Sequence, residues 1–138
     1  YKVLVVGSTQ DAGIYNLLST MEISGLGNDV DIYAVFTGED DNRSAVTEFM
    51  EDYILSGPSI TYCPYDEAQK DFRKDICALL DLNPNILATP LTVMITPDDR
   101  ICMIGFGTPN IISTINDITS GDLVITTTTT VTTTCGNY

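Results

Sequence analysis

The sequence predicts a single α/β domain with a mixed sheet flanked by helices, followed by a threonine-rich C-terminal extension. Two nearly continuous apolar runs rich in β-branched residues, at residues 2–8 and 30–37, are typical of strands covered on both faces. Segments with apolar residues at helical spacing follow each run, as in the βαβ units of a parallel sheet. Two later apolar runs, at 91–96 and 100–107, are joined by a Pro-Asp-Asp turn, which predicts a hairpin that adds antiparallel strands.

The predicted elements follow the order βαβαβαββα. Asp11 is placed to cap the first helix, and a short strand at residues 60–64 precedes a third helix at 67–80. We expect the last helix to start with Thr108 as N-cap and Pro109 at its first position. The side chains expected to face the core from the four helices are Ile14, Leu17, Leu18, Met21, Ala45, Val46, Phe49, Met50, Tyr53, Ile54, Phe72, Ile76, Leu79, Leu80, Ile111, Ile112, Ile115 and Ile118.

Length and charge limit the class of protein. With 138 residues the chain is long enough for one domain with its own core, and 43% hydrophobic and 18% charged residues are ordinary for a globular protein. The formal net charge of −13 repels phosphate backbones, so neither nucleic acid nor an anionic membrane surface is an expected partner. No run approaches the roughly 18 apolar residues of a membrane span.

The candidate redox or cross-linking residues are Cys63, Cys77, Cys102 and Cys135. They form no CxxC pair, and since the chain has no histidine, no familiar zinc site can be assembled and no metal or cofactor is expected. They are either buried thiols, which pack as small apolar groups, or members of up to two disulfides with three connectivities. The chain opens at Tyr1 within a predicted strand and without an initiator methionine, so we expect a removed upstream segment and an extracellular or periplasmic location.

The segment at residues 88–107, ATPLTVMITPDDRICMIGFG, places Thr89 and Pro90 directly before a strand. Proline has no backbone N–H to donate to a sheet, so this position indicates a cis bond or a sharp turn. Together with KVLVVGS, VDIYAVFTGEDDNRSAVTEFMEDY and TPNIISTI, the segment resembles the thioredoxin-like superfamily over residues 1–118, above all its extracytoplasmic TlpA/ResA branch and peroxiredoxin relatives. The resemblance implies that Pro90 is the family's cis-proline, in a loop beside the start of the first helix.

The resemblance also identifies a missing redox centre. In that family a CxxC motif begins the first helix, where the helix N-terminus lowers the thiol pKa. At that position this chain has Asp11, Ala12, Gly13 and Ile14, which provide a good helix cap and no thiol. The resemblance therefore implies a thioredoxin-like domain without the usual redox chemistry.

Two function classes follow from these observations. The first is a non-catalytic domain, not an enzyme, with a structural or assembly role outside the cytoplasm. The alternative is a diverged thiol-disulfide oxidoreductase or peroxidase that uses Cys77, which follows Arg73 and Lys74, or Cys63. A third hypothesis is a module that holds an extended peptide or protein partner at the Pro90 loop, where the family's substrate groove lies.

Two surface motifs are also candidates for sites. Glu39, Asp40 and Asp41 form a dense acidic cluster, and clusters of oxygen ligands suit calcium. Since no EF-hand pattern follows, a solvated turn that caps the next helix is the favoured interpretation. Asn42 begins an Asn-Arg-Ser sequence that satisfies the N-glycosylation pattern.

Residues 121–138 form an extension beyond the predicted domain of residues 1–120. Its sequence, GDLVITTTTTVTTTCGNY, consists mainly of strand-forming threonine and valine and contains neither proline nor lysine. Fully extended, residues 123–134 would span about 40 Å at roughly 3.3 Å per residue, whereas strands in globular domains are about 17–20 Å long. We therefore expect part of the extension to project from the domain.

Three alternatives are open for this extension: a flexible linker, an O-glycosylated stalk, or a strand donated to the sheet edge of a neighbour. Linkers favour Gly, Ser and Pro, and mucin-like stalks usually contain Pro, so donation is the favoured interpretation. Repeated head-to-tail donation builds an open filament, so we expect a homo-oligomer or filament in which Cys135 fastens the junction. The residues of the expected assembly strand are Leu123, Val124, Ile125 and Val131.

Overall fold

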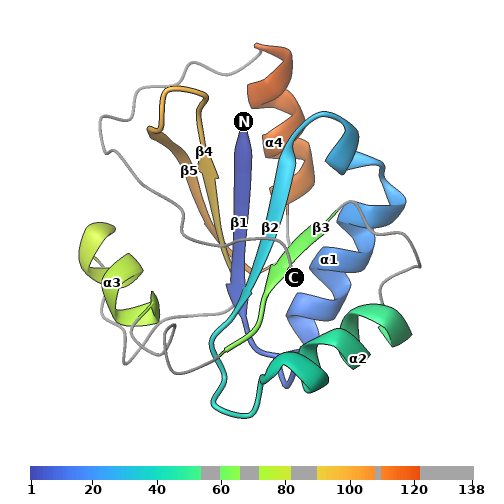
Figure 1. Cartoon of the computed structure of the whole chain (residues 1–138). Coiled ribbons are helices and arrows are strands. Elements are labelled where there is room, and N and C mark those ends of the chain that lie inside the picture. Colours follow the sequence, from blue (N-terminus) through green and yellow to red (C-terminus); the bar gives the residue numbers. More distant parts are fainter. Residues whose placement is uncertain (54–59, 66–71, 82–89, 108–109, 122–138) are drawn as a thin grey trace.

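The computed structural model describes residues 1–53, 60–65, 72–81, 90–107 and 110–121 (Figure 1). In these residues the chain follows the predicted order βαβαβαββα, with one short 3₁₀ helix, η1 (Leu26–Asn28), between the first helix and the second strand. The strands are β1 (Lys2–Gly7), β2 (Asp31–Phe36), β3 (Ile60–Cys63), β4 (Leu91–Ile95) and β5 (Ile101–Phe106). The α-helices are α1 (Ala12–Ile23), α2 (Arg43–Tyr53), α3 (Phe72–Leu79) and α4 (Ile111–Ser120).

The five strands form one mixed sheet in the order β3-β2-β1-β4-β5. β1, β2 and β3 run parallel, β4 is antiparallel to β1, and β5 is antiparallel to β4. The side chains from Val3 to Val6 are at most 1% exposed, which explains why this central strand shows no alternation of apolar and polar residues. The predicted mixed sheet with a closing hairpin is confirmed.

The turn between β4 and β5 has the predicted hairpin geometry. The Thr96 N–H donates to the Arg100 carbonyl at 2.8 Å, and the Thr96 hydroxyl donates to the Asp98 carboxylate. This hydrogen bond, with Arg100 Nε at 3.2 Å from an Asp98 oxygen, holds the pKa of Asp98 below its usual range. Asp99 adopts the left-handed conformation, at φ 63°, that an aspartate in a tight turn tolerates.

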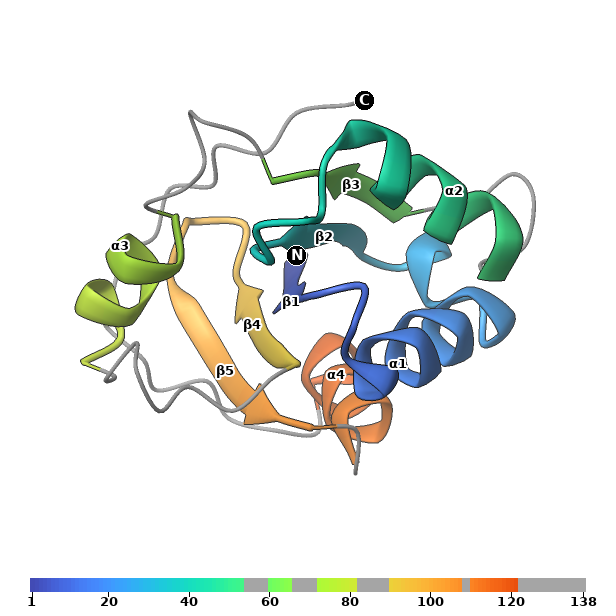
Figure 2. The ribbon, with the colours of Figure 1, turned by 90° about the horizontal axis from the view of Figure 1, so that it is seen from below.

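Helices α1, α2 and α4 cover one face of the sheet, and α3 lies against the other (Figure 2). The larger core fills the space under the three helices. The smaller core joins Ile76 and Cys77 of α3 to side chains of β1, β3 and β4. In the described part of the chain, no helix is both long and apolar enough to cross a membrane.

Most helix residues that were predicted to face the core do so, but Leu79 does not. The buried ones are Ile14, Leu17, Leu18, Met21, Val46, Phe49, Met50, Ile76, Ile111, Ile115 and Ile118. Leu79 is 43% exposed, so its prediction is wrong. At 3.6 residues per turn, the inward face of α3 is centred between Ile76 and Cys77, roughly 110° from Leu79. The side chains of Tyr53, Ile54 and Phe72 lie outside those described.

The two ends of α4 bear on the predicted N-cap and on the predicted boundary of the domain. The helix starts at Ile111 with Asn110 as N-cap, so the predicted cap at Thr108 is wrong, and residues 108–109 lie outside those described. Gly121 is the C-cap at φ 83°, a left-handed conformation that glycine adopts without strain. The extension from residue 122 is also outside the described residues, so the division into domain and extension stays a prediction.

Candidate functional site

The candidate site lies where β1 and β2 end, α1 begins and Pro90 leads into β4. Backbone hydrogen bonds join the ends of neighbouring strands here: the Thr37 N–H, after β2, donates to the Gly7 carbonyl of β1 at 2.8 Å, and the Gly107 N–H, after β5, donates to the Pro90 carbonyl at 2.9 Å. The ends of parallel strands are the usual place for sites in α/β sheets. The structure thus brings together the two segments that the sequence singled out, the start of α1 and the proline loop.

Asp11 is the N-cap of α1, as predicted. One oxygen of its carboxylate accepts a hydrogen bond from the Gly13 N–H at 3.0 Å, and its own N–H donates to the Ser8 carbonyl at 3.0 Å. These bonds satisfy donors that a helix N-terminus otherwise leaves unpaired, and the negative charge suits the positive end of the helix. The site therefore presents a capping carboxylate at the place where a helix N-terminus would favour a thiolate.

Pro90 packs against the first turn of α1. A Cβ atom added to Gly13 would lie 2.9 Å from Cδ of Pro90 and 3.2 Å from an Asp11 carboxylate oxygen. Real side chains do not approach this closely, so only glycine lets the proline ring sit here. The proximity implied by the resemblance is observed, whereas Thr89 lies outside the described residues. The cis bond and the use of this loop to hold a peptide stay predictions.

Replacing Gly13 by alanine is expected to destabilise the domain by about 1–3 kcal/mol, the usual cost of forcing an extra methyl group into a packed contact. Helix propensity alone would make the alanine variant more stable, because alanine is a better helix former than glycine. A loss of stability would therefore come from the contact with Pro90. The measurement is urea unfolding followed by circular dichroism. Asn16→Ala, at an exposed position of the same helix, is the matched control and is expected to be neutral or slightly stabilising. Equal stability of the two variants would contradict the close packing of Pro90 on Gly13.

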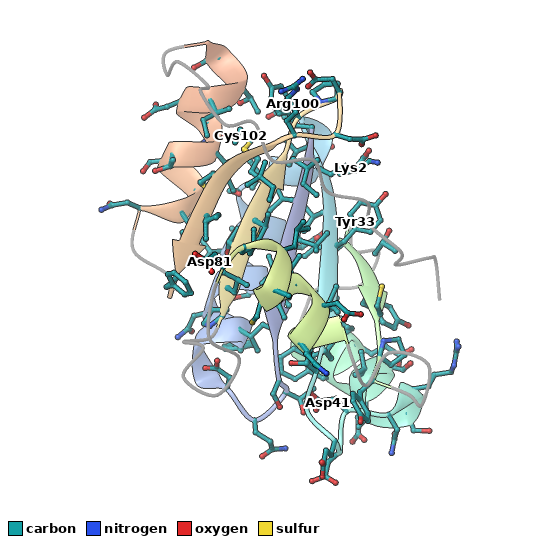
Figure 3. The ribbon with its side chains drawn as sticks, turned by 90° about the vertical axis from the view of Figure 1, so that its left-hand side faces the viewer. Lys2, Tyr33, Asp41, Asp81, Arg100 and Cys102 are labelled. Atoms are coloured by element: carbon teal, nitrogen blue, oxygen red, sulfur yellow. The ribbon has the colours of Figure 1, made fainter. Side chains whose placement is uncertain are left out.

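Asp41, which the sequence analysis assigned to a solvated acidic turn, is a buried carboxylate at this end of the sheet. It is 0% exposed and accepts hydrogen bonds from the Thr9 N–H at 3.2 Å, from the Thr9 hydroxyl and from the Gly38 N–H at 3.2 Å. Its own carbonyl accepts from the Tyr65 N–H at 2.7 Å. Figure 3 shows Asp41 at the end of the sheet opposite Lys2 and Arg100. Asp41 therefore ties the loop after β1 to the loop after β2 and to the end of β3.

This finding corrects the interpretation of the acidic cluster. Glu39 and Asp40 are exposed, as expected for a solvated turn, but Asp41 is not. Asn42, the predicted glycosylation site, is exposed, and its side-chain oxygen accepts from the Ala45 N–H at 3.0 Å, which caps α2. Within the described ranges, no group of three or more acidic or cysteine residues is arranged to hold a metal ion. Glycosylation of Asn42 stays a prediction.

None of the described cysteines belongs to the α1–Pro90 site. Cys63 ends β3 with no exposed surface and is disulfide-bonded, whereas Cys77 of α3, also fully buried, and Cys102 of β5 are thiols. The Cys102 thiol donates to the Met94 carbonyl at 3.5 Å, and burial raises the pKa of that thiol. Since Cys77 and Cys102 are not oxidised, the alternative of two disulfides does not apply to this structure. Cys135 lies outside the described residues.

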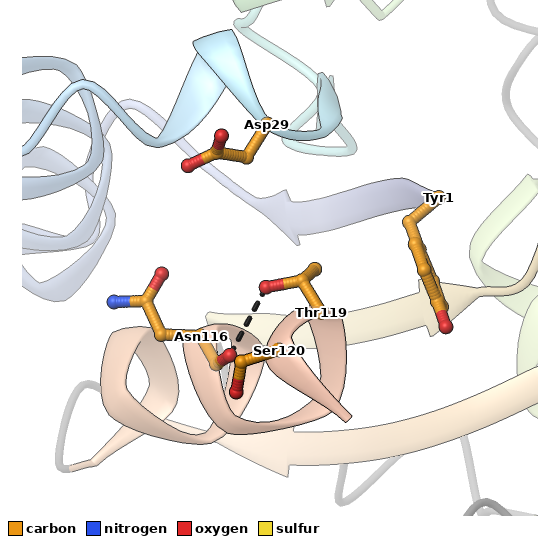
Figure 4. A pocket seen from close by; sticks show the side chains of 5 residues that line it. All are labelled: Tyr1, Asp29, Asn116, Thr119 and Ser120. Atoms are coloured by element: carbon orange, nitrogen blue, oxygen red, sulfur yellow. Dashed lines mark hydrogen bonds between the residues drawn. The ribbon is translucent and has the colours of Figure 1, made fainter. Parts of the chain in front are cut away.

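An open hollow of about 450 Å³ lies at the opposite end of the sheet (Figure 4). Its lining consists of Tyr1, Asp29, Asn116, Thr119 and Ser120. The Thr119 hydroxyl is turned back to the Asn116 carbonyl at 3.0 Å, so this polar group is occupied within α4. Among the described residues, no basic side chain lines the hollow, and its position is far from the start of α1. We assign it no role in the site.

Comparisons with known proteins identify the fold. No protein-family model matches the sequence, and no curated protein matches it. Among solved structures, the chain is similar to MTB DsbF, in its mixed oxidised and reduced forms, with 13% identity and a TM-score of 0.58 over 86% of this chain and 78% of that one.

Two further solved structures are similar over comparable lengths. A protein assigned as thiol:disulfide interchange protein DsbE from Chlorobium tepidum has 8% identity and a TM-score of 0.54, over 88% of this chain and 77% of that one. A protein assigned to electron transfer from Aquifex aeolicus VF5 has 14% identity and a TM-score of 0.61, over 87% of this chain and 81% of that one. Similarity at these identities shows a shared fold and does not transfer an activity.

Proposed function

Since the chain has the thioredoxin-like fold and no CxxC motif, we propose that it is a non-catalytic domain with a structural, self-associating role outside the cytoplasm. The observation that carries this proposal is the start of α1. Beside Pro90, where the fold would place a reactive thiol, Asp11 is engaged as a helix cap. A carboxylate held in this way stabilises the N-terminus of the helix, and it cannot replace a thiolate as the nucleophile of thiol-disulfide chemistry.

The alternative, a thiol oxidoreductase or peroxidase using Cys77 or Cys63, has less support. Such chemistry needs an accessible thiolate with a lowered pKa. Cys63 is already in a disulfide, and both Cys63 and Cys77 have no exposed surface. Cys102 is only partly buried, but desolvation raises its pKa, which disfavours the thiolate. The three described cysteines thus lack the environment of a catalytic thiol.

Edge strand β5 is the acceptor that we propose for a strand donated by a second copy. It lies at one end of the sheet formed by the described strands, and it contains no charged residue. Ile104 and Phe106 are 43% and 44% exposed, and a hollow of about 190 Å³ lies along Ile101–Ile104. Natural edge strands usually carry charges, prolines or bulges that prevent pairing. The irregularity in β5 is near Ile101, so Met103–Phe106 is a regular, uncharged edge.

Charge supports the extension of a second copy as the partner of β5. Whole chains repel one another through a net charge of −13 each. Residues 123–134 and the β5 strand are both uncharged, so pairing them adds no like-charge repulsion at the contact. The strand-forming threonine and valine residues of the extension suit addition to a sheet edge by backbone hydrogen bonds.

The proposed location outside the cytoplasm is supported by a cysteine. A disulfide at Cys63 fits an oxidising, extracytoplasmic compartment, because disulfides rarely persist in the cytosol.

Assembly is tested by comparing the full chain with a chain that ends at Ser120 in negative-stain microscopy, after circular dichroism has shown that both are folded. We expect fibres or long oligomers from the full chain alone, and single particles from both would refute the assembly role.

A further inference from the structure

The hollow lined by Tyr1, Asp29, Asn116, Thr119 and Ser120, here called the polar hollow, is held open by the fold (Figure 4). Asp29 follows η1, and its N–H donates to the Leu26 carbonyl at 3.0 Å. The Tyr1 carbonyl accepts from the Asp31 N–H at 3.0 Å, and the Tyr1 side chain packs against the larger core. With a volume of about 450 Å³, the polar hollow has the size of a small-molecule site.

The lining of the polar hollow consists mainly of groups that accept hydrogen bonds. Asn116, Thr119 and Ser120 share one face of α4, because they are three and four residues apart. The Thr119 hydroxyl donates to the Asn116 carbonyl at 3.0 Å, and the Ser120 hydroxyl donates to the Asp117 carbonyl at 3.1 Å. A hydroxyl that has donated its proton can only accept a further hydrogen bond, and the Asp29 carboxylate is also an acceptor. The polar hollow therefore favours a ligand that donates hydrogen bonds.

The charge of the polar hollow is negative. Asp29 contributes a carboxylate, and the C-terminal end of α4 contributes the negative end of the helix dipole. The last turn of α4 contains no basic residue. Lys2 follows Tyr1 in the chain, but its Nζ lies 3.9 Å from an Asp99 carboxylate oxygen at the β4–β5 turn. The negative charge is thus not neutralised by the residues that line the polar hollow, and we expect it to attract a cation.

The donor groups distinguish an organic cation from a metal ion. Within the described ranges, no group of three or more acidic or cysteine residues is arranged to hold a metal ion. A single carboxylate is a poor site for a hard divalent cation, which takes six or more oxygen ligands. An ammonium group has three N–H donors and no acceptor, so it matches a lining of carboxylate, hydroxyl and carboxamide oxygens.

We propose that the polar hollow binds an alkylammonium group. Figure 4 shows Asp29 and Asn116 on facing walls, with Tyr1 to one side. The ammonium nitrogen would lie between the Asp29 carboxylate and the Asn116 amide oxygen. The alkyl chain would extend toward Tyr1, whose aromatic face attracts both apolar groups and cations.

This inference is independent of the proposed assembly role. The polar hollow is formed by η1, α4 and the start of β1, and it includes no residue of the edge strand β5. An ammonium group can come from a free amine or from the side chain of a lysine in a peptide. The chemistry of recognition is the same for both, and the experiment separates them.

The test is saturation-transfer NMR of the full chain at neutral pH and low ionic strength, with the signal read on the ligand. This readout works for single and for assembled chains. The probes are putrescine, the Nα-acetyl N-methylamide of lysine, and butanediol, in which hydroxyls replace both ammonium groups of putrescine. We expect saturation of an amine but not of butanediol, with a dissociation constant of about 1 mM, which is usual for a ligand with few non-hydrogen atoms. The amine that binds more tightly identifies the source.

Matched variants separate the polar hollow from the general charge of the chain. With a net charge of −13, the chain also attracts amines without a site. Asp29→Asn and Asp40→Asn each remove one exposed carboxylate and leave the same net charge. We expect Asp29→Asn to weaken amine binding about fivefold, the upper range for an exposed ion pair, and Asp40→Asn to leave it unchanged.

Three results would overturn the inference. In the first, neither amine receives saturation from the natural chain. In the second, butanediol receives as much saturation as putrescine, so that the charge of the ammonium group is not recognised. In the third, Asp29→Asn binds the amine as tightly as Asp40→Asn does, so that the amine is held by overall charge and not by the polar hollow. Circular dichroism of both variants checks that they are folded.

Discussion

Replacing Ile104 by lysine is expected to abolish self-association of the full chain while leaving the domain folded. Ile104 lies in the regular part of edge strand β5, and its side chain is 43% exposed. A lysine on an edge strand is a common natural device against strand addition, because pairing would remove its charge from water. Sedimentation velocity is expected to show long oligomers for the natural chain and a single slow species for the variant.

Ile23→Lys is the matched control for this experiment. Ile23 is 74% exposed at the end of α1, so this substitution makes the same change of apolar surface to positive charge away from β5. The control is expected to assemble like the natural chain. If both lysine variants assemble normally, β5 is not the acceptor. If both fail, the effect comes from general charge or solubility and not from the edge.

Replacing Asp41 by alanine is expected to lower the free energy of unfolding by about 3 kcal/mol, a large part of the stability of a small domain. The substitution leaves the buried N–H groups of Thr9 and Gly38 without their acceptor, and each such group costs about 1–3 kcal/mol. The loops after β1 and β2 would then lose the link between them. In thermal unfolding, the midpoint is expected to fall by roughly 10 °C.

Asp40→Ala is the control for Asp41, since the neighbouring carboxylate is exposed. Surface substitutions of this kind usually change stability by no more than about 0.5 kcal/mol. Asp41→Asn keeps one oxygen acceptor and is expected to fall between the two alanine variants. Urea unfolding gives all three values under one condition. Equal stability of the Asp40 and Asp41 variants would show that the buried hydrogen bonds do not tie the loops together.

The sheet and its helices are predictable from sequence because local periodicity reports burial directly. The unbroken apolar run from Val3 to Val6, rich in β-branched valine, is typical of a strand covered on both faces, and the structure covers it with helices on both sides. Leu79 shows the limit of this approach. Cys77 lies on the buried face of α3 and Leu79 does not. A pattern that counts only large apolar residues leaves out the cysteine, and it therefore places Leu79 on the buried face.

The candidate site is less predictable because its key contacts join residues far apart in the chain. Glu39, Asp40 and Asp41 are chemically alike in the sequence, and only the approach of Thr9 from the loop after β1 separates the buried carboxylate from the exposed pair. The packing of Pro90 on Gly13 was accessible only through the resemblance to thioredoxin-like proteins. The disulfide state of Cys63 had no sequence signal beyond an even number of cysteines.

The measurement that tests the central claim most directly is the rate at which each thiol of the folded, unreduced full chain reacts with iodoacetamide at neutral pH. The account predicts that Cys77 and Cys102 react slowly until the chain is unfolded, because Cys77 is buried and the pKa of Cys102 is raised. One rapidly alkylated thiol, together with turnover in a disulfide-reduction or peroxide assay, would contradict the non-catalytic role and establish the chain as a redox enzyme.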